Sequence, residues 1–336
     1  PMTKMMNAAV YERYGPPEVV KIKQVSRPTI KPDQVLIKVH ATSVTMGDAR
    51  LRAWNIPSPL FSFIARFMIG IFKPRNQILG TSAVGTIEEL GAEVKGFSIG
   101  DRVLGSTEMK MGAHAEYVVA QADRSVAHLP EQITTDQAAG LLFGGSAALY
   151  FLRDLGKLQP GQRVLIVGAS GALGSIGVQY AKHIGAHVTA VCSGPNHEFV
   201  RSLGADETID YTKEDFTKRT LDDDQRFDAI YESVGKSSYN QCKHLMTERG
   251  AFLPAVMRLP EVLQLVWTPL FSKRRVKSGV AMTNPEKLTT LIDLAESGAV
   301  TPAIESVYPF EDIVQAHRHV DKGHKRGNVI VRISDD

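Results

Sequence analysis

Residues 163–182 read RVLIVGASGALGSIGVQYAK, and this stretch decides the fold of the chain. An apolar run, Arg163–Val167, ends in a glycine-rich turn that leads directly into a helical pattern. Glycines let a backbone come close to a pyrophosphate, and the first turn of a helix offers it free N–H groups and the positive end of the helix dipole. The stretch therefore predicts a dinucleotide-binding turn, with Gly171 and Gly174 where backbone approach and helix–strand packing require small residues.

The residues around this turn supply the context that a glycine motif alone lacks, because glycine-rich turns also occur for purely steric reasons. Strands are predicted at 163–167, 187–191, 207–209, 227–231 and 251–253, and helices at 172–184, 198–203 and 239–246. This alternation predicts a parallel sheet with helices on both faces, a doubly wound α/β domain. A methyltransferase that binds a nucleoside cofactor remains an alternative for the turn.

The N-terminal part shows short strands separated by Gly, Pro and Asp, which is typical of an irregular β-barrel or sandwich. These strands are predicted at 8–11, 19–25, 35–44, 83–90, 102–105 and 115–120, and an apolar helical run follows at 138–155. After Pro285, two amphipathic helices (285–298 and 310–321) and a strand (327–333) have no core of their own. We expect this tail to pack back onto the N-terminal β domain. The predicted domains are 1–127 together with 283–336, and 128–282.

The composition is that of a globular protein, since 43% hydrophobic and 22% charged residues are enough for two cores. The net charge of +3 comes without a run of Lys or Arg, so no nucleic-acid partner is expected. The two cysteines, Cys192 and Cys242, and the lack of a secretion signal predict a reducing, cytoplasmic environment. The apolar stretch 59–72 is too short to span a membrane and carries Arg66 in its middle.

The end of the second strand of the α/β domain bears on the choice of cofactor. A carboxylate there would bind the ribose 2′-hydroxyl of NAD and repel the 2′-phosphate of NADP. No acidic residue occurs between Val191 and Glu198, whereas Ser193 and Asn196 can donate to a phosphate and Arg201 or Lys213 could come near. The pattern favours NADP(H) over NAD(H). The alternative is an uncharged loop that selects neither.

Further motifs stand in order along the chain: YGPPEV at 14–19, GFSIGDRV at 96–103, GAHAEY at 112–117, SLGAD at 202–206 and HKRGNV at 324–329. Together with the glycine-rich turn, they make the chain resemble the medium-chain dehydrogenase/reductase superfamily, in its zinc-independent quinone oxidoreductase-like branch. The resemblance covers nearly all of residues 6–333. It implies a discontinuous GroES-like β-barrel domain, an inserted Rossmann domain, an active site in the cleft between them, and a homodimer.

The same resemblance implies which residues contact the cofactor. They are Gly168, Ala169, Ser170, Gly171, Ala172, Leu173, Gly174, Ser193, Tyr211 (towards the 2′-phosphate), Val234, Gly235, Gly279, Val280 and Asn328. Two positions depart from the family pattern. Pro195 stands where members that prefer NADPH often have a basic residue, and Ala147 stands where a threonine usually lies near the nicotinamide.

Zinc is not expected, because the positions that match the zinc ligands of related enzymes hold poor ligands. They hold Thr45 or Met46, Thr81 with Ser82, and Gly145 or Ser146. Without a Lewis acid to stabilise an alkoxide, the favoured reaction is hydride transfer from NADPH to the β-carbon of an enone or to a quinone ring. The charge then spreads onto a carbonyl oxygen, and hydrogen-bond donors and solvent complete the protonation.

Candidate catalytic residues follow the third predicted strand. By resemblance, Thr45 stands where relatives often have an asparagine that faces the nicotinamide, and Asp48 matches an aspartate of that loop. Arg50 falls where some enoyl reductases have a proton-donating tyrosine. Arginine is no general acid at neutral pH, but it can stabilise an enolate or bind a carboxylate or phosphate. The alternative is an Asp48–Arg50 ion pair on the surface.

Two apolar segments, 59–72 and 259–271, are candidates for the walls of an apolar substrate cleft, or else belong to the core or a dimer contact. The function that the sequence favours is a zinc-independent NADPH-dependent reductase of quinones or α,β-unsaturated carbonyls. An enoyl-thioester reductase and a non-catalytic NADPH-binding protein remain open.

Overall fold

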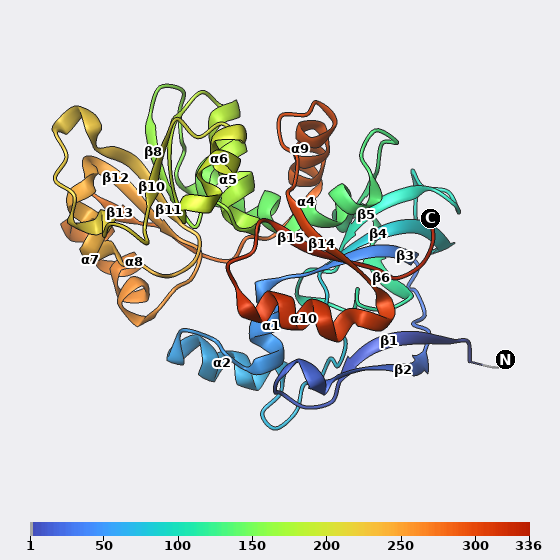
Figure 1. Cartoon of the computed structure of the whole chain (residues 1–336). Coiled ribbons are helices and arrows are strands. Elements are labelled where there is room, and N and C mark those ends of the chain that lie inside the picture. The colour runs from blue at the N-terminus through green and yellow to red at the C-terminus, as the bar shows by residue number, and fades with distance from the viewer. Residues whose placement is uncertain (1–2) are drawn as a thin grey trace.

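The computed structural model describes residues 3–336, and its C-terminal half is built around the predicted parallel sheet. Six strands run in the order β10-β9-β8-β11-β12-β13, all parallel (Figure 1). They are β8 (Arg163–Val167), β9 (His187–Cys192), β10 (Glu207–Asp210), β11 (Phe227–Glu232), β12 (Met246–Pro254) and β13 (Arg275–Val276). This is the doubly wound order, in which connections leave the central strands β8 and β11 in opposite directions.

Strand β8 is buried on both faces because its side chains alternate between two cores. Val164 and Ile166 belong to the core that also contains Ile176 of the following helix. Leu165 and Val167 belong to the core on the opposite face. The helices of this half are α5 (Ala172–His183), α6 (His197–Ser202), α7 (Tyr239–Cys242) and α8 (Leu259–Phe271).

The N-terminal half forms an antiparallel pair, β1 with β2, and a seven-stranded sheet in which β6 pairs with β3 beside the path β14-β15-β3-β4-β5-β7. The strands are β1 (Met5–Tyr11), β2 (Val20–Ser26), β3 (Gln34–Val44), β4 (Ser82–Leu90), β5 (Arg102–Ser106), β6 (Tyr117–Gln121), β7 (Val126–His128), β14 (Ile304–Pro309) and β15 (Asn328–Arg332). Strand β15 pairs with β3, so both ends of the chain build one sheet. The expectation that the C-terminal tail packs onto the N-terminal β domain is confirmed.

The remaining helices are α1 (Met46–Ala53), α2 (Pro59–Ile69), α3 (Ala122–Ser125), α4 (Thr135–Ala148), α9 (Pro285–Glu296) and α10 (Ile313–Lys322). Helix α4 begins at the Thr134 cap and continues as a π-helical segment, Leu149–Leu155. No helix within residues 3–336 is both long and apolar enough to cross a membrane.

One predicted element was wrong in detail, and strand β14 was missed. The helix expected at 239–246 ends at Cys242 as α7, and Met246 begins strand β12. Met246 is fully buried and pairs with Phe227, and a short apolar run of this kind fits a strand as well as a helix. Strand β14 was not predicted, because its alternation of intermediate and exposed residues carries little apolar signal.

A buried arginine joins parts of the β domain that lie at opposite ends of the chain. Arg52 of α1 lies fully buried, and its guanidinium donates to Asp321 at 2.5 Å and to Nδ1 of His317 at 2.7 Å, both on α10. Its Nε donates to the carbonyl oxygen of Gly15 at 3.1 Å. Burial lowers the pKa of His317 well below its usual value, so the ring is neutral and accepts from Arg52. One side chain therefore links three segments of the chain.

We expect Arg52→Met to lower the free energy of unfolding by about 3 kcal/mol, because it leaves Asp321 and His317 without their donor. The matched control is Arg318→Met on α10, the helix that Arg52 contacts. Arg318 pairs with Glu18 in solvent, and such exposed pairs contribute less than about 1 kcal/mol. Urea denaturation of both variants checks this, and equal losses would contradict the central role of Arg52.

Candidate functional site

The glycine-rich turn connects β8 to α5 as the sequence predicts. Gly168 has a φ of +76°, and the N–H groups of Gly168 and Ala169 both donate to the carbonyl oxygen of Val191 at 3.1 Å. Gly171 is the N-cap of α5 and has no side chain to cap the helix. The first N–H groups of α5, from Ala172 onward, therefore have no side-chain cap at Gly171 and can donate hydrogen bonds to an anionic ligand.

The glycines of the turn have different physical roles. A Cβ on Gly174 would collide with the carbonyl oxygen of Gly168, and one on Gly168 would come within 2.5 Å of Val234. A Cβ on Gly171 would meet only the Gly168 oxygen, at an ordinary 3.5 Å. Gly174 thus permits the packing of helix on strand, while Gly171 leaves open space beside the helix start.

The C-terminal segment crosses over this turn. The N–H of Gly327 donates to the carbonyl oxygen of Ser170 at 2.9 Å, and Gly327 bridges to Gly171. Asn328 is buried, and its side-chain amide donates to the carbonyl oxygen of Ala303 at 2.9 Å. The turn therefore lies where the β domain meets the parallel sheet (Figure 1).

Beyond the end of β9, three residues form a polar group that the sequence only partly predicted. Ser193 Oγ accepts from the Asn196 amide at 2.9 Å. Arg326 donates to Oδ1 of Asn196 at 2.5 Å and to the carbonyl oxygen of Pro195 at 2.8 Å. Sequence reasoning missed Arg326. It stands within the motif at 324–329, but nothing in local spacing shows that it reaches a loop 130 residues away.

The other basic candidates lie differently. Arg201 donates to the hydroxyl of Thr208 at 2.8 Å. Tyr211 is half-exposed, and its hydroxyl lies 3.5 Å from Nδ1 of His324 in the same C-terminal segment. Within residues 3–336, neither the Arg201 nor the Lys213 side chain forms a hydrogen bond with the Ser193–Asn196 loop, whereas the Arg326 side chain forms two.

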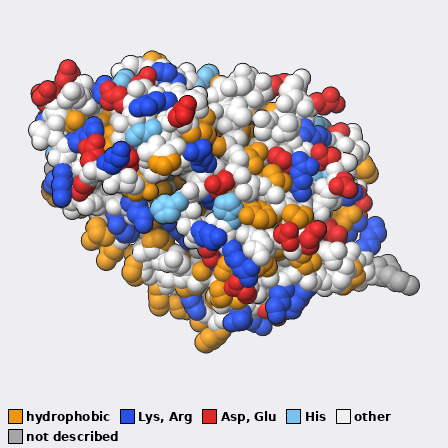
Figure 2. Space-filling view, in the orientation of Figure 1, with side chains coloured by type: hydrophobic (Ala, Val, Ile, Leu, Met, Phe, Trp, Pro, Cys, Tyr) orange, Lys and Arg blue, Asp and Glu red, His pale blue; other side chains and the backbone are white. Residues whose placement is uncertain are grey.

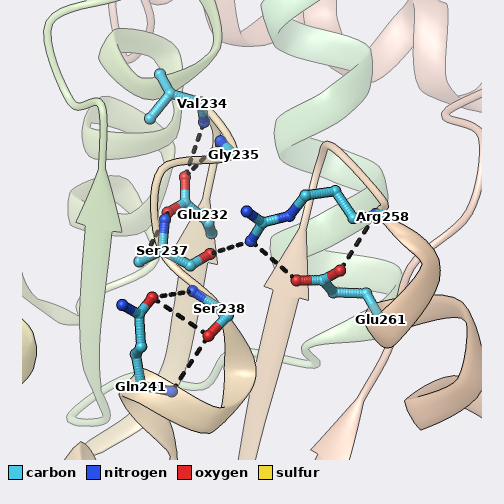
Figure 3. A network of polar contacts seen from close by, with 8 residues as sticks. All are labelled: Glu232, Val234, Gly235, Ser237, Ser238, Gln241, Arg258 and Glu261. Carbon is cyan, nitrogen blue, oxygen red and sulfur yellow. Dashed lines mark hydrogen bonds and ion pairs between the residues drawn. The ribbon is translucent and has the colours of Figure 1, made fainter. Parts of the chain in front are cut away.

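A buried carboxylate shapes the turn after β11, as Figure 3 shows. One oxygen of Glu232 accepts from the N–H groups of Val234 and Gly235, each at 2.9 Å, and the other accepts from the N–H and hydroxyl of Ser237. Glu232 is completely buried. It therefore holds the predicted contact residues Val234 and Gly235 in place, a role that sequence reasoning did not assign.

The same network reaches helix α8 (Figure 3). Arg258 donates to the carbonyl oxygen of Ser237 at 3.2 Å and to Glu261 at 3.1 Å.

On the predicted nicotinamide side, a Cβ on Gly279 would collide with the hydroxyl of Tyr150, and Val280 is 65% exposed. Ala147, which stands where a threonine was expected, is buried in α4.

The candidate catalytic residues begin helix α1. Thr45 is its N-cap and forms a capping box with Asp48: the Asp48 N–H donates to Thr45 Oγ1 at 3.1 Å, and the Thr45 N–H donates to Asp48 Oδ2 at 2.9 Å. Asp48 is 2% exposed, and its other oxygen accepts from the N–H of Gly80 at 3.1 Å. These bonds give Asp48 a positioning role.

The alternative of a surface ion pair between Asp48 and Arg50 is wrong, because Asp48 is buried and its carboxylate is hydrogen-bonded to Thr45 and Gly80. Arg50 is partly buried and forms no ion pair within residues 3–336. Burial lowers the pKa of Arg50, but a guanidinium stays charged at neutral pH. The residue therefore carries a positive charge without an ion-pair partner in the last turn of α1.

No group of three or more His, Cys, Asp or Glu side chains that could hold a metal ion occurs within residues 3–336. Beside the candidate catalytic residues, His114 Nε2 lies 3.7 Å from Asp48 and 2.9 Å from the carbonyl oxygen of Ser43. Both cysteines are buried free thiols, and burial raises their pKa values. The residues present do not form a zinc ligand set.

We expect Gly171→Ala and Gly174→Ala to separate the two glycine roles. Gly174→Ala should destabilise the protein by about 1–3 kcal/mol, because its methyl group overlaps the Gly168 carbonyl. Gly171→Ala should leave stability unchanged and weaken NADPH binding, because its methyl group enters only the open space. Thermal unfolding and fluorescence titration with NADPH check this. Unchanged affinity in Gly171→Ala would show that the cofactor does not approach there.

Two family models match the chain. One is described as an alcohol dehydrogenase GroES-like domain and matches residues 31–131. The other is described as a zinc-binding dehydrogenase and matches residues 203–331.

Similar proteins match over almost the whole chain. The mitochondrial NAD(P)H oxidoreductase RTN4IP1 of Mus musculus is 31% identical over 98% of this chain and 89% of its own length. The 2-methylene-furan-3-one reductase of Solanum lycopersicum is 31% identical over 97% of this chain and 79% of its own. The structure of the quinone oxidoreductase from Coxiella burnetii has a TM-score of 0.87 and 28% identity, covering 98% of this chain and 100% of that one. The chain thus belongs to the medium-chain dehydrogenase/reductase superfamily, in its quinone oxidoreductase-like branch, and is an oxidoreductase of that type.

Proposed function

We propose that this oxidoreductase uses NADPH, without zinc, to reduce quinones or α,β-unsaturated carbonyl compounds. The observation that carries the proposal is the glycine-rich turn, which presents the free start of α5 and the open space at Gly171 where the two halves of the chain meet. The relatives support the substrate class, since they include a quinone oxidoreductase and an enone reductase by name.

The preference for NADPH is supported by the polar group at the end of β9. Ser193 and Asn196 offer hydrogen-bond donors, and Arg326 brings the positive charge that Pro195 does not supply. A guanidinium binds phosphate with two parallel hydrogen bonds, which suits a 2′-phosphate. The Tyr211 hydroxyl lies 3.5 Å from Nδ1 of His324, a residue two positions before Arg326. The pyrophosphate would lie at the start of α5, over Gly168–Gly174.

The bound dinucleotide would supply a hydride to an electrophilic carbon of the substrate, and the negative charge that results would spread onto a carbonyl oxygen. The residues of the chain then have three tasks. Asp48 holds Thr45 and the start of α1. Arg50, with no carboxylate partner among the described ion pairs, would stabilise the enolate oxygen electrostatically. Val234, Gly235, Gly279, Val280 and Asn328 would align the nicotinamide, and water would complete the protonation.

The assembly proposed with this function is a homodimer formed at the edge of the parallel sheet, where β13 is the last strand. The domains would be 1–127 with 283–336 for the GroES-like domain and 128–282 for the Rossmann domain. The buried free cysteines agree with a reducing, cytoplasmic location.

The test of the activity follows oxidation of NADPH and NADH with quinones, free enones and enoyl thioesters, each with and without a metal chelator. We expect turnover of quinones or free enones with NADPH, unchanged by the chelator. Loss of activity on chelation would overturn the zinc-free mechanism. Turnover confined to thioesters would favour the enoyl-thioester alternative, and tight NADPH binding without any turnover would favour a non-catalytic role.

We expect Arg326→Ala to weaken NADPH binding about 10- to 100-fold, the loss of roughly 1.5–3 kcal/mol for a hydrogen bond to a charged group. NADH binding should stay unchanged, because NADH lacks the 2′-phosphate. The matched control is Arg201→Ala, which removes a nearby guanidinium that bonds Thr208 instead. Titration of both variants with both cofactors checks this, and equal losses for NADPH and NADH would place Arg326 outside the phosphate site.

A further inference from the structure

Helix α2 is amphipathic, but its large apolar side chains face solvent and its polar side chains face the protein. Its half-buried residues are Ser62, Ala65, Arg66 and Ile69, and no residue of the helix is fully buried. Ser62 accepts from the Trp54 indole at 3.0 Å, and the Arg66 guanidinium lies 4.7 Å from the Trp54 ring. The polar side chains thus attach the helix to the protein, and its apolar side chains are left outside.

The outer side chains of this segment are large. The exposed ones are Leu60, Phe61, Phe63, Ile64, Phe67, Met68, Ile71 and Phe72, with Phe63 67% exposed, Met68 65% and Phe72 91%. Single exposed apolar residues are ordinary on protein surfaces, but a contiguous set on one helix marks an interaction surface.

Helix α8 of the other half repeats the pattern. Its buried residues are polar, namely Glu261, Gln264 and Thr268, spaced on one face. Its exposed ones are Leu259, Leu263, Val266, Trp267, Leu270 and Phe271, with Leu270 71% exposed and Phe271 80%. Of the alternatives for residues 59–72 and 259–271, a place in the core does not hold for most of their apolar side chains, which are exposed; Leu265 is an exception and packs against a core of the parallel sheet.

Both apolar helices are followed directly by basic residues. Lys73 and Arg75 follow α2, are exposed, and form no ion pair within residues 3–336. Lys273, Arg274 and Arg275 follow α8. Lys273 pairs with Glu248, whereas Arg274 and Arg275 donate to backbone carbonyls and keep their net charge. No Asp or Glu occurs at 56–75 or at 262–277.

The two helices face the same side of the molecule. In Figure 1, α2 and α8 lie at the lower left, one from each half of the chain. Figure 2 shows hydrophobic side chains gathered along this edge, with Lys and Arg side chains beside them. We call the exposed apolar side chains of 60–72 and 259–271, with their basic flanks, the α2–α8 surface.

We propose that the α2–α8 surface docks the protein onto a bilayer of anionic phospholipids. The apolar side chains would lie at the boundary between headgroups and acyl chains, and the basic flanks would contact the headgroups. An apolar face bordered by Lys and Arg is the pattern of helices that lie in the membrane interface. At 11 and 13 residues, α2 and α8 are too short to span the hydrocarbon core. A second copy of the chain is the competing occupant. The basic flanks of one copy would repel those of another at this surface, so the homodimer proposed above would pair its β13 edges instead and leave the apolar side chains of α2 and α8 for the bilayer.

The docking surface goes beyond the reductase activity proposed above. Vesicle binding is measured without turnover, so failure of the docking proposal and failure of the proposed reaction are distinguishable.

The experiment sediments the full chain with phosphatidylcholine vesicles, with and without phosphatidylglycerol, at low and high salt. We expect binding to the anionic vesicles that weakens with salt. Met68→Ser with Phe72→Ser, and Leu270→Ser with Phe271→Ser, should each lower partitioning at least about tenfold, since each removes two side chains that would leave water. Lys73→Glu with Arg75→Glu should lower binding to the anionic vesicles alone.

The matched control is Ile99→Ser, which removes an equally exposed apolar side chain (68%) from a turn of the β domain. It should leave partitioning unchanged. An equal loss in the control, or no binding of the unaltered protein to anionic vesicles, would overturn the proposal. Light scattering tests the alternative of a contact between copies. If the unaltered protein does not bind vesicles and the α2 and α8 variants have a lower oligomeric mass than it has, the surface is a contact between copies and membrane docking is overturned.

Discussion

The carbonyl oxygen of Gly168 lies so close to the α carbon of Gly174 that no side chain fits between them. This approach brings the start of α5 against the end of β8, which is the central strand of the sheet and is buried on both faces. The contact places the uncapped N–H groups at the start of α5, and the open space at Gly171, beside the end of β8. A larger residue at position 174 would move the helix away and remove the geometry on which a dinucleotide site depends.

The second half of the site arrives from the other end of the chain. Strand β15 is fixed in the β domain by its pairing with β3, and the residues just before it cross the glycine-rich turn at Ser170 and Gly171. The same segment carries Arg326 to Asn196 and His324 to Tyr211. One short piece of chain therefore joins the two domains and brings Arg326 and His324 to the loop proposed to bind the 2′-phosphate, so the proposed cofactor site depends on the packing of the domains.

The outer surface follows a different logic from the cores. In α2 and α8 the polar contacts with the protein come from Ser62 and Arg66 in one helix and from Glu261 and Thr268 in the other. Leu265 and Trp267 add apolar contacts from α8. Burial of the polar groups is satisfied by hydrogen bonds and stacking, which leaves most of the aromatic and aliphatic side chains outside. Arg258 and Glu261 connect α8 to the turn at Val234, so this apolar surface is built on the same supports as the site.

The sequence by itself determined the elements whose causes lie within a few residues. Glycine spacing predicted the turn, strand and helix periodicity predicted the parallel sheet, and the apolar face of the tail predicted its return to the β domain. Only the tertiary structure decided that Arg326 reaches Asn196, that Asp48 caps a helix instead of pairing with Arg50, and that Glu232 holds the next turn. It also showed that Met246 starts a strand and that two apolar helices face outward. The reach of Arg326 depends on which distant segments meet, and local spacing carries no information about a partner 130 residues away in the chain. The bonds of Asp48 to Thr45 and of Glu232 to the next turn span at most five residues, but the burial of both carboxylates, which excludes a surface ion pair for Asp48, is decided by the packing of the whole fold.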